Sequence, residues 1–452
     1  MRHQPSSLEE DWVRDISELT ENRELLEIGI KLVKPKGSNC LLCRGSRLLC
    51  GKVRCPVMLR WESLLDISKK ISSTSLIGSS PPGVFVGRIG YPYVYAGPLI
   101  PPERGDTSYF ENQSLWFDLN LDSLVQLRAN LVRGSFRVRI DRPSVAGRLF
   151  ELTQEMSLAE APVDCEAIFT KPPSGRIVFD SDAQPFGPSG LVESLRAHSV
   201  RVDRRLERAF SDTDMKATEG MLELYFKGVN VSSIQRALSV GALGDARKRK
   251  LVPTRWSITA VDSTLGLKLI EDIKLNPPIS DYLVFSSRSM DNLYLVLLAP
   301  GDWSYELIEI FHPGSVWNRY AEEIAIGSDF EGRSGRTTYA RIGGCYYAAR
   351  FAVAEFLNNI KKQATVVVLR EAKPGYVLPV GVWHVREGVR RALSSKPERF
   401  SNLRDAVRHV SVSIRCPISK VVRESTLFKS LLSQSRLTDF IKSGLSNLGN
   451  TQ

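Results

Sequence analysis

The chain has 452 residues, of which 42% are hydrophobic and 25% are charged, so its composition is that of a folded globular protein. Its length predicts about two to four structural units, and it contains no run of about 18 apolar residues that would predict a transmembrane helix. Because the N-terminus is polar and acidic, without an apolar signal region, we expect a cytoplasmic protein. The formal net charge of +11 favours a polyanionic partner, most often nucleic acid.

The N-terminal region predicts two helices around a cysteine-rich segment. Residues 7–29 carry a capping-box start and a glycine stop, and residues 61–71 form a second helical stretch. The Ser/Gly/Pro-rich residues 78–83 then predict a linker. We therefore place the first unit at residues 1–80.

The cysteine-rich segment predicts a metal site. It contains four cysteines within 16 residues: Cys40, Cys43, Cys50 and Cys55. A C-x2-C pair places two thiolates on one turn, at the separation of adjacent corners of a tetrahedron. Nearby glycines allow sharp turns, and basic neighbours offset the charge of a tetrathiolate. We predict a structural zinc ion and a small zinc-binding module; the irregular spacing of the later cysteines keeps an iron–sulfur cluster and redox thiols as alternatives.

The body of the chain mixes strand and helix patterns without a regular βαβ repeat, which predicts an α+β (mixed α/β) fold. We divide it into a first part, 81–250, and a second part, 251–425. Strands are predicted at 84–102, 135–143, 254–261, 281–287, 292–300, 304–311 and 365–371. Helices are predicted within 191–240 and at 346–363, 381–395 and 402–410.

Aromatic and basic residues in the body are candidates for nucleic-acid contact. Tyr91, Tyr93 and Tyr95 fall on one face of a strand, with Arg88 nearby, and such rings can stack on bases. Packing on a sheet face is the alternative. The other candidates for phosphate binding are Arg247, Lys248, Arg249 and Lys250, and Arg333 and Arg336 of a glycine-rich segment that lacks the P-loop signature.

A polar strand face is the candidate for catalysis. If residues 254–261 form a strand, then Arg255, Ser257 and Thr259 face one way, and Asp262 lies at the strand end. Such a face could hold a phosphate or a nucleotide, and these four residues are then the catalytic candidates. The alternative is a buried structural network. Whether the chain is a nucleotide- or nucleic-acid-processing enzyme stays open at this point.

The last residues, 426–452, are rich in Ser, Asn and Gly and predict a flexible tail. They contain a glutamine, an aliphatic residue three positions on and two bulky apolar residues three further on: Gln434, Leu437, Phe440 and Ile441. One helical turn would place the three apolar side chains on one face, as a plug for a hydrophobic pocket. This spacing matches the peptide that binds the sliding clamp (PCNA), with an isoleucine where an aromatic residue is usual.

Long segments of the chain resemble the archaeal NreA DNA-repair family. These are the cysteine run at 40–55, the stretches at 86–99, 127–134, 250–266, 343–355 and 379–390, and the tail. The resemblance implies a cytoplasmic archaeal protein of the DNA-damage response that works with the sliding clamp. Together with the positive net charge, this role makes DNA the expected polyanionic partner. It implies no particular reaction and no particular lesion.

Overall fold

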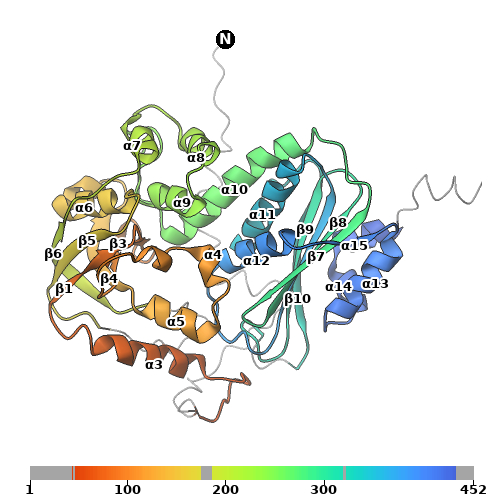
Figure 1. Cartoon of the computed structure of the whole chain (residues 1–452), viewed down its shortest axis with the longest axis horizontal. Coiled ribbons are helices and arrows are strands. Elements are labelled where there is room, and N and C mark those ends of the chain that lie inside the picture. Colours follow the sequence, from red (N-terminus) through yellow and green to blue (C-terminus); the bar gives the residue numbers. More distant parts are fainter. Residues whose placement is uncertain (1–42, 44–45, 175–185, 319–321, 434–452) are drawn as a thin grey trace, which may run out of the picture.

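The computed structural model describes residue 43 and residues 46–174, 186–318 and 322–433. These residues form two six-stranded mixed sheets and a set of helices, which confirms the α+β fold class (Figure 1). The first sheet lies at the left of Figure 1 and the second at the right, with helices between them. None of the helices in the described part of the chain is long and apolar enough to cross a membrane.

The first sheet contains the tyrosine-rich stretch. Its strands, in spatial order, are β1 (Ser75–Ser80), β5 (Val163–Phe169), β6 (Ser189–Ala197), β4 (Val132–Arg139), β3 (Tyr93–Ile100) and β2 (Val84–Val86). The pair β4–β6 is parallel and the other pairs are antiparallel. The strands expected in the range 84–143 are therefore confirmed.

Two parts of the first sheet differ from the sequence-based prediction. Strand β1 occupies part of the predicted linker, and β6 occupies the start of a region predicted to be helical. In β1 the small residues are needed because a neighbouring segment lies very close: a Cβ atom on Gly78 would lie 1.9 Å from the carbonyl oxygen of Pro101. A stretch that reads as a linker is thus a tightly packed strand.

The helices of the first half lie around the first sheet and between the two sheets. They are α3 (Pro56–Ser68), α4 (Gln113–Trp116), α5 (Leu121–Ala129), α6 (Arg148–Ser157), α7 (Arg204–Ser211), α8 (Ala217–Phe226), α9 (Val231–Ser239) and α10 (Thr254–Ile273). Short 3₁₀ turns span Ser108–Phe110 and Pro143–Ala146. The helix predicted at 61–71 is confirmed as α3, although it begins earlier, at a proline. The helix predicted at 7–29 lies outside the described residues.

Helix α10 contradicts the strand predicted at 254–261. The β-branched residues of this stretch favour a strand, but tertiary packing overrides that preference. Along 20 residues, buried positions such as Val261, Leu265 and Leu269 recur with helical spacing and belong to the main hydrophobic core. The proposed polar strand face is therefore wrong as a piece of secondary structure.

The second sheet is buried on both faces. Its strands, in spatial order, are β10 (Ala325–Glu331), β9 (Ser304–Phe311), β11 (Thr365–Ala372), β8 (Asn292–Ala299), β7 (Tyr282–Ser289) and β12 (Glu398–Phe400). One face packs on α11 (Gly344–Asn359), α12 (Trp383–Leu393) and α10, and the other packs on α13 (Leu403–Ser413), α14 (Ile418–Glu424) and α15 (Thr426–Ser433) (Figure 1). Because both faces are covered, every residue of β8 is buried.

Helix α15 begins where the flexible tail was predicted to begin. The carboxylate of Glu306, in β9, accepts hydrogen bonds from the backbone N–H groups of Thr426 (2.9 Å) and Leu427 (2.7 Å) and from the hydroxyl of Ser425 (2.6 Å). A carboxylate at a helix N-terminus satisfies backbone donors that would otherwise have no partner. Residues 426–433 are thus part of the folded body.

Candidate nucleic-acid interface

The start of β3 presents aromatic rings to solvent. Tyr93 and Tyr95 are 43% and 47% exposed, whereas the alternating Val94 and Ala96 are buried in the core. This alternation follows from the strand geometry, in which successive side chains point to opposite faces. Tyr91, just before the strand, is 53% exposed. The three tyrosines therefore form an accessible aromatic row and do not serve as sheet-face packing.

Arginines of the neighbouring strand β4 lie beside these rings. In the antiparallel pair, Tyr93 is opposite Arg139 and Tyr95 is opposite Arg137. The guanidinium of Arg137 lies 4.8 Å from the centroid of the Tyr93 ring, and that of Arg139 lies 5.8 Å from it. Sequence reasoning did not select these arginines, although their alternation with Phe136 and Val138 is a visible signal of an exposed basic face.

The N-terminus of α10 closes one end of the aromatic row. The hydroxyl of Thr254 accepts a hydrogen bond from the backbone N–H of Val86 (2.9 Å), and the Trp256 ring lies 6.0 Å from the Tyr91 ring. Arg255 is exposed in the same turn. Burial of part of its side chain and the nearby positive charge of Arg88 lower the pKa of Arg255. Two guanidinium groups thus lie near each other, which is an arrangement that an anion would stabilise.

The basic stretch at 247–250 is followed directly by Leu251, which contacts the chain just after the end of β4. The backbone N–H of Leu251 donates to the carbonyl of Ile140 (2.9 Å), and the N–H of Ile140 donates to the carbonyl of Pro92 (3.0 Å). Three side chains of this neighbourhood, Arg247, Lys248 and Lys250, are exposed. Their position extends the positive charge beyond the tyrosine row.

Arg249 differs from its neighbours because it is used inside the fold. Its guanidinium donates to the carbonyl oxygens of Gly244 (2.8 Å), Phe210 (2.8 Å) and Asp212 (2.6 Å). It therefore stabilises the loop that carries the basic stretch and has little capacity left for a phosphate.

We call segments 87–95, 137–142 and 247–256 together the aromatic–basic surface. The three segments contain nine basic residues and one acidic residue, Asp141, whose carboxylate is paired with Arg139 at 2.6 Å. The basic residues are Arg88, Arg137, Arg139, Arg142, Arg247, Lys248, Arg249, Lys250 and Arg255. This surface combines positive charge with exposed aromatic rings, the combination that proteins use to bind nucleic acid.

The two remaining phosphate-binding candidates lie by the second sheet and have partners there. Arg336 pairs with Asp329 (3.0 Å) and donates to the carbonyl of Tyr339 (3.3 Å). Arg333 lies 3.3 Å from Asp302 and 3.3 Å from the side-chain oxygen of Gln363. Both guanidinium groups are therefore engaged with the protein's own carboxylate and carbonyl oxygens.

The catalytic candidates do not form an open site. The hydroxyl of Ser257 donates to the carbonyl of Thr254 (3.0 Å), and that of Thr259 donates to the carbonyl of Arg255 (3.4 Å), both within α10. Asp262 is completely buried. Of the four candidates, only Arg255 is exposed, so the geometry gives no support to a reaction centre built from all four.

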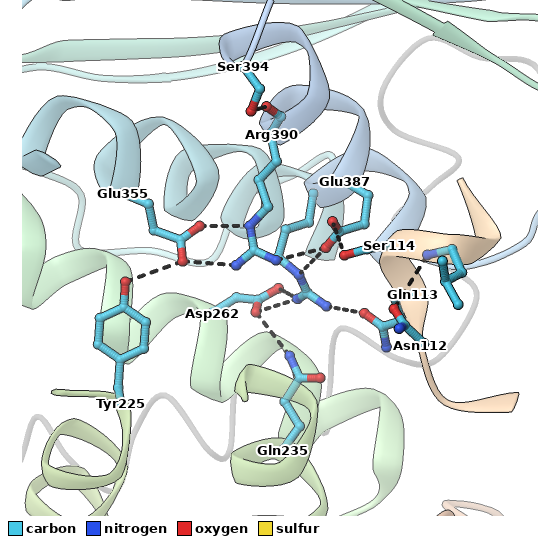
Figure 2. A network of polar contacts seen from close by, with 12 residues as sticks. Asn112, Gln113, Ser114, Tyr225, Gln235, Asp262, Glu355, Glu387, Arg390 and Ser394 are labelled. Carbon is cyan, nitrogen blue, oxygen red and sulfur yellow. Dashed lines mark hydrogen bonds and ion pairs between the residues drawn. The ribbon is translucent and has the colours of Figure 1, made fainter. Parts of the chain in front are cut away.

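Asp262 belongs to a buried polar network, which was the alternative interpretation. Its carboxylate oxygens lie 2.6 and 2.7 Å from Nη1 of Arg386, in α12, and Nε2 of Gln235, in α9, donates to one of them at 3.0 Å (Figure 2). Nη2 of Arg386 donates to Gln113 of α4 at 2.6 Å. Burial raises the pKa of Asp262, and the charge of Arg386 opposes that rise.

A second ion-pair group completes the network. Arg390, one turn further along α12, holds both carboxylate oxygens of Glu355 in α11 (2.8 and 2.9 Å) and one of Glu387 (2.7 Å). Tyr225 of α8 donates to Glu355 at 3.2 Å (Figure 2). The network thus ties α8–α12 and α4 together at a point between the two sheets. We therefore expect its role to be structural.

The cysteine segment forms turns and packs against the second half of the chain. The carbonyl of Cys43 accepts from the N–H groups of Ser46 (3.2 Å) and Arg47 (3.3 Å), and Cys55 is the N-cap of α3. The buried Lys52 donates to the carbonyl of Val377. The segment is therefore attached to the body.

The structure describes three of the four proposed metal ligands. Cys40 lies outside the described residues, and among those described, no three histidine, cysteine, aspartate or glutamate side chains gather as a metal site. The zinc ligands therefore stay a prediction. The clamp-peptide residues, Gln434, Leu437, Phe440 and Ile441, also lie outside the described residues.

Comparison with known proteins identifies the family. The model of the archaeal Nre N-terminal region matches residues 49–318, and that of the Nre C-terminal region matches residues 331–440. The DNA repair protein NreB of Archaeoglobus fulgidus is 42% identical over 392 residues, which are 86% of this chain and 97% of that protein.

Two further relatives carry the name DNA repair protein NreA. That of Archaeoglobus fulgidus is 40% identical over 82% of this chain and 93% of its own length, and that of Haloferax volcanii is 35% identical over 82% and 90%. No solved structure matches the chain. The two family models and the long matches to these relatives show that this chain belongs to the archaeal Nre family.

Proposed function

We propose that this protein is a cytoplasmic archaeal DNA-repair factor that binds DNA through its aromatic–basic surface. The observation that carries the proposal is the gathering of nine basic residues and three exposed tyrosines on three adjoining segments that contain one acidic residue. The names of the relatives, which are DNA repair proteins, support DNA as the polyanion. Since the catalytic candidates are not brought together in an open site, binding is the function that the geometry favours.

DNA binding is expected to depend steeply on salt and on the exposed cations. Neutralising Arg137, Lys248 and Lys250 together to glutamine should weaken binding about 100-fold or more at low salt. It should also reduce the slope of log affinity against log salt by about two to three, since each lost phosphate contact removes roughly 0.7–0.9 from the slope. Fluorescence anisotropy with a labelled oligonucleotide at several salt concentrations measures both quantities.

A matched control removes the same number and kind of charges elsewhere. Arg408, Lys361 and Lys396 are exposed and belong to the second half of the chain. Their triple glutamine variant should change the affinity by less than about threefold, because non-specific attraction by net charge is screened beyond about 10 Å. Equal losses in both triple variants, or a flat salt dependence of the unaltered protein, would refute the proposed surface.

We also propose that the sliding clamp (PCNA) recruits this protein to DNA through the peptide at 434–441. The proposal rests on the spacing of Gln434, Leu437, Phe440 and Ile441 and on the position of the peptide directly after α15. Glu306 holds the start of α15 on the second sheet. The peptide comes directly after this anchored helix in the sequence. In Figure 1 this helix lies on the far side of the second sheet from the first sheet.

Phe440→Ala is expected to abolish co-elution with the sliding clamp in size-exclusion chromatography. Phe440 is the bulkiest member of the proposed plug, and removal of a central aromatic anchor typically weakens binding by about 30-fold or more. Leu445→Ala, which alters the same tail outside the motif, should co-elute like the unaltered protein. If the Phe440 variant still co-elutes, the peptide is not the clamp-binding element.

We further propose that Cys40, Cys43, Cys50 and Cys55 hold one structural zinc ion. The spacing of the four cysteines supports this, together with the turn at Cys43 and the position of Cys55 at the start of α3. A closed set of four thiolates leaves no open coordination position, so the ion would stabilise the segment and would take no part in a reaction.

A further inference from the structure

The aromatic–basic surface contains exposed aromatic rings in addition to the positive charge that attracts DNA. Positive charge alone is enough to bind the phosphate backbone of a duplex. Here, however, Tyr91, Tyr93 and Tyr95 keep about half of their surface exposed, although rings of this size are usually buried or covered. Exposed rings in the middle of a basic surface indicate a partner that offers flat, unstacked faces.

The spacing of the rings does not match the spacing of bases that are stacked on one another in a duplex. Tyr93 and Tyr95 are two residues apart on β3, so their side chains lie about 7 Å apart along the strand. Neighbouring bases in a duplex are about 3.4 Å apart. Two adjacent bases can each meet one of these rings only when the bases have separated, and in a duplex the base faces are covered by the neighbouring pairs.

Cations lie directly beside the tyrosine rings. Arg137 and Arg139 lie within 6 Å of the Tyr93 ring. Arg139 is also paired with Asp141 through two hydrogen bonds (2.6 and 3.0 Å), whereas the exposed guanidinium of Arg137 can pair with a phosphate or stack on a base. At the end of the row, Arg88 and Arg255 lie close enough to each other for Arg88 to lower the pKa of Arg255. Aromatic rings and cations therefore lie next to each other on the same surface.

We infer that the aromatic–basic surface binds single-stranded DNA, with unpaired bases stacked on Tyr93 and Tyr95. This inference rests on the proposed DNA binding and names its substrate class. A single strand is the form of DNA that offers free base faces and flexible phosphates at once, and strand faces bearing aromatic residues bind single strands in this way. Tyr91, which contacts Trp256, extends the row toward α10.

The test compares one 20-nucleotide single strand with the duplex of the same sequence. Anisotropy titrations at one salt concentration should give at least about tenfold tighter binding of the single strand. The double variant Tyr93→Ala/Tyr95→Ala should weaken single-strand binding by roughly 10- to 100-fold, because two stacking rings are lost. Its duplex affinity and its salt slope should stay unchanged, since no cation is removed. Its melting temperature should equal that of the unaltered protein.

Two control variants separate stacking from other effects. Tyr93→Phe/Tyr95→Phe keeps both rings and should bind the single strand within about threefold of the unaltered protein. Phe330→Ala removes an exposed aromatic ring on β10 of the second sheet and should have no effect.

The outcomes distinguish the two proposals. If the protein binds neither form of DNA, the proposed function fails and this inference fails with it. If the duplex binds as tightly as the single strand, or if the alanine variant weakens both equally, DNA binding stands and the stacking inference is overturned.

Discussion

Asp262→Asn is expected to lower the free energy of unfolding by about 3–5 kcal/mol, because it removes the nearest counter-charge of the buried Arg386 and leaves Glu387, 3.7 Å away, as the remaining carboxylate partner. Both side chains are at most 1% exposed, so water cannot replace the lost interaction. The amide also changes one acceptor oxygen into a donor, which sets it against Arg386 or Gln235. Urea denaturation followed by circular dichroism measures the change.

The matched control is Asp118→Asn, which breaks an ion pair of similar length on the surface. Asp118 and Arg391 are 2.6 Å apart, but their side chains are 65% and 51% exposed. Exposed pairs contribute about 0–1 kcal/mol, so this variant should unfold almost like the unaltered protein. The double variant Asp262→Leu/Arg386→Met should recover most of the loss, because it removes both charges together. Unchanged stability of Asp262→Asn would contradict the structural role and reopen a catalytic one.

Metal analysis of the purified protein is expected to give one zinc per chain, and Cys50→Ser should reduce this to below about 0.1. Removal of the proposed ion should release the segment around residues 46–55 from the body, while the two sheets stay folded on their own large cores. Limited proteolysis should therefore cut the variant in this segment at least about tenfold faster, because local unfolding exposes the chain there.

Cys416→Ser is the control for the cysteine prediction. Cys416 is buried, and its thiol donates to the carbonyl of Pro417 (3.7 Å), far in sequence from the four proposed ligands. This variant should keep its zinc. Iron with acid-labile sulfide in place of zinc would support the iron–sulfur alternative, and protein without bound metal would refute the site.

Much of the second sheet is predictable because its strands are long apolar runs. The strands β7, β8, β9 and β11 are recognisable in this way, and so is the long alanine-rich helix α11. Helix α10 is not, since its first turns carry β-branched residues and its helical pattern depends on packing against α9 and α11. Strand β1 could not be predicted for a different reason. Its serines and glycine are typical of a linker, and only the close packing of the segment around Pro101 explains why small residues are found there.

In the candidate interface, too, some features can be predicted from local sequence and others depend on the tertiary structure. The alternation of Tyr93 and Tyr95 is a local pattern, and the structure places both rings on one exposed face of β3, whereas Tyr91, predicted on the same face, lies in the turn before the strand. The partners of those rings depend on the register between β3 and β4, which no local pattern reveals. Asp262 is an extreme case, because its ion-pair partner lies 124 residues away in sequence. Its burial could not be inferred without the fold.

The capping of α15 by Glu306 has a consequence for the reach of the proposed clamp peptide. Gln434 is bonded to Ser433, the last residue of α15, so their Cα atoms are about 3.8 Å apart. No linker residues therefore separate α15 from the proposed peptide, and a clamp that binds the peptide would lie close to the second sheet. A short linker gives the two tethered partners a high effective concentration but allows few relative orientations between them. If both proposals hold, the folded body between α15 and the first sheet would set the distance between the bound clamp and the proposed DNA-binding surface.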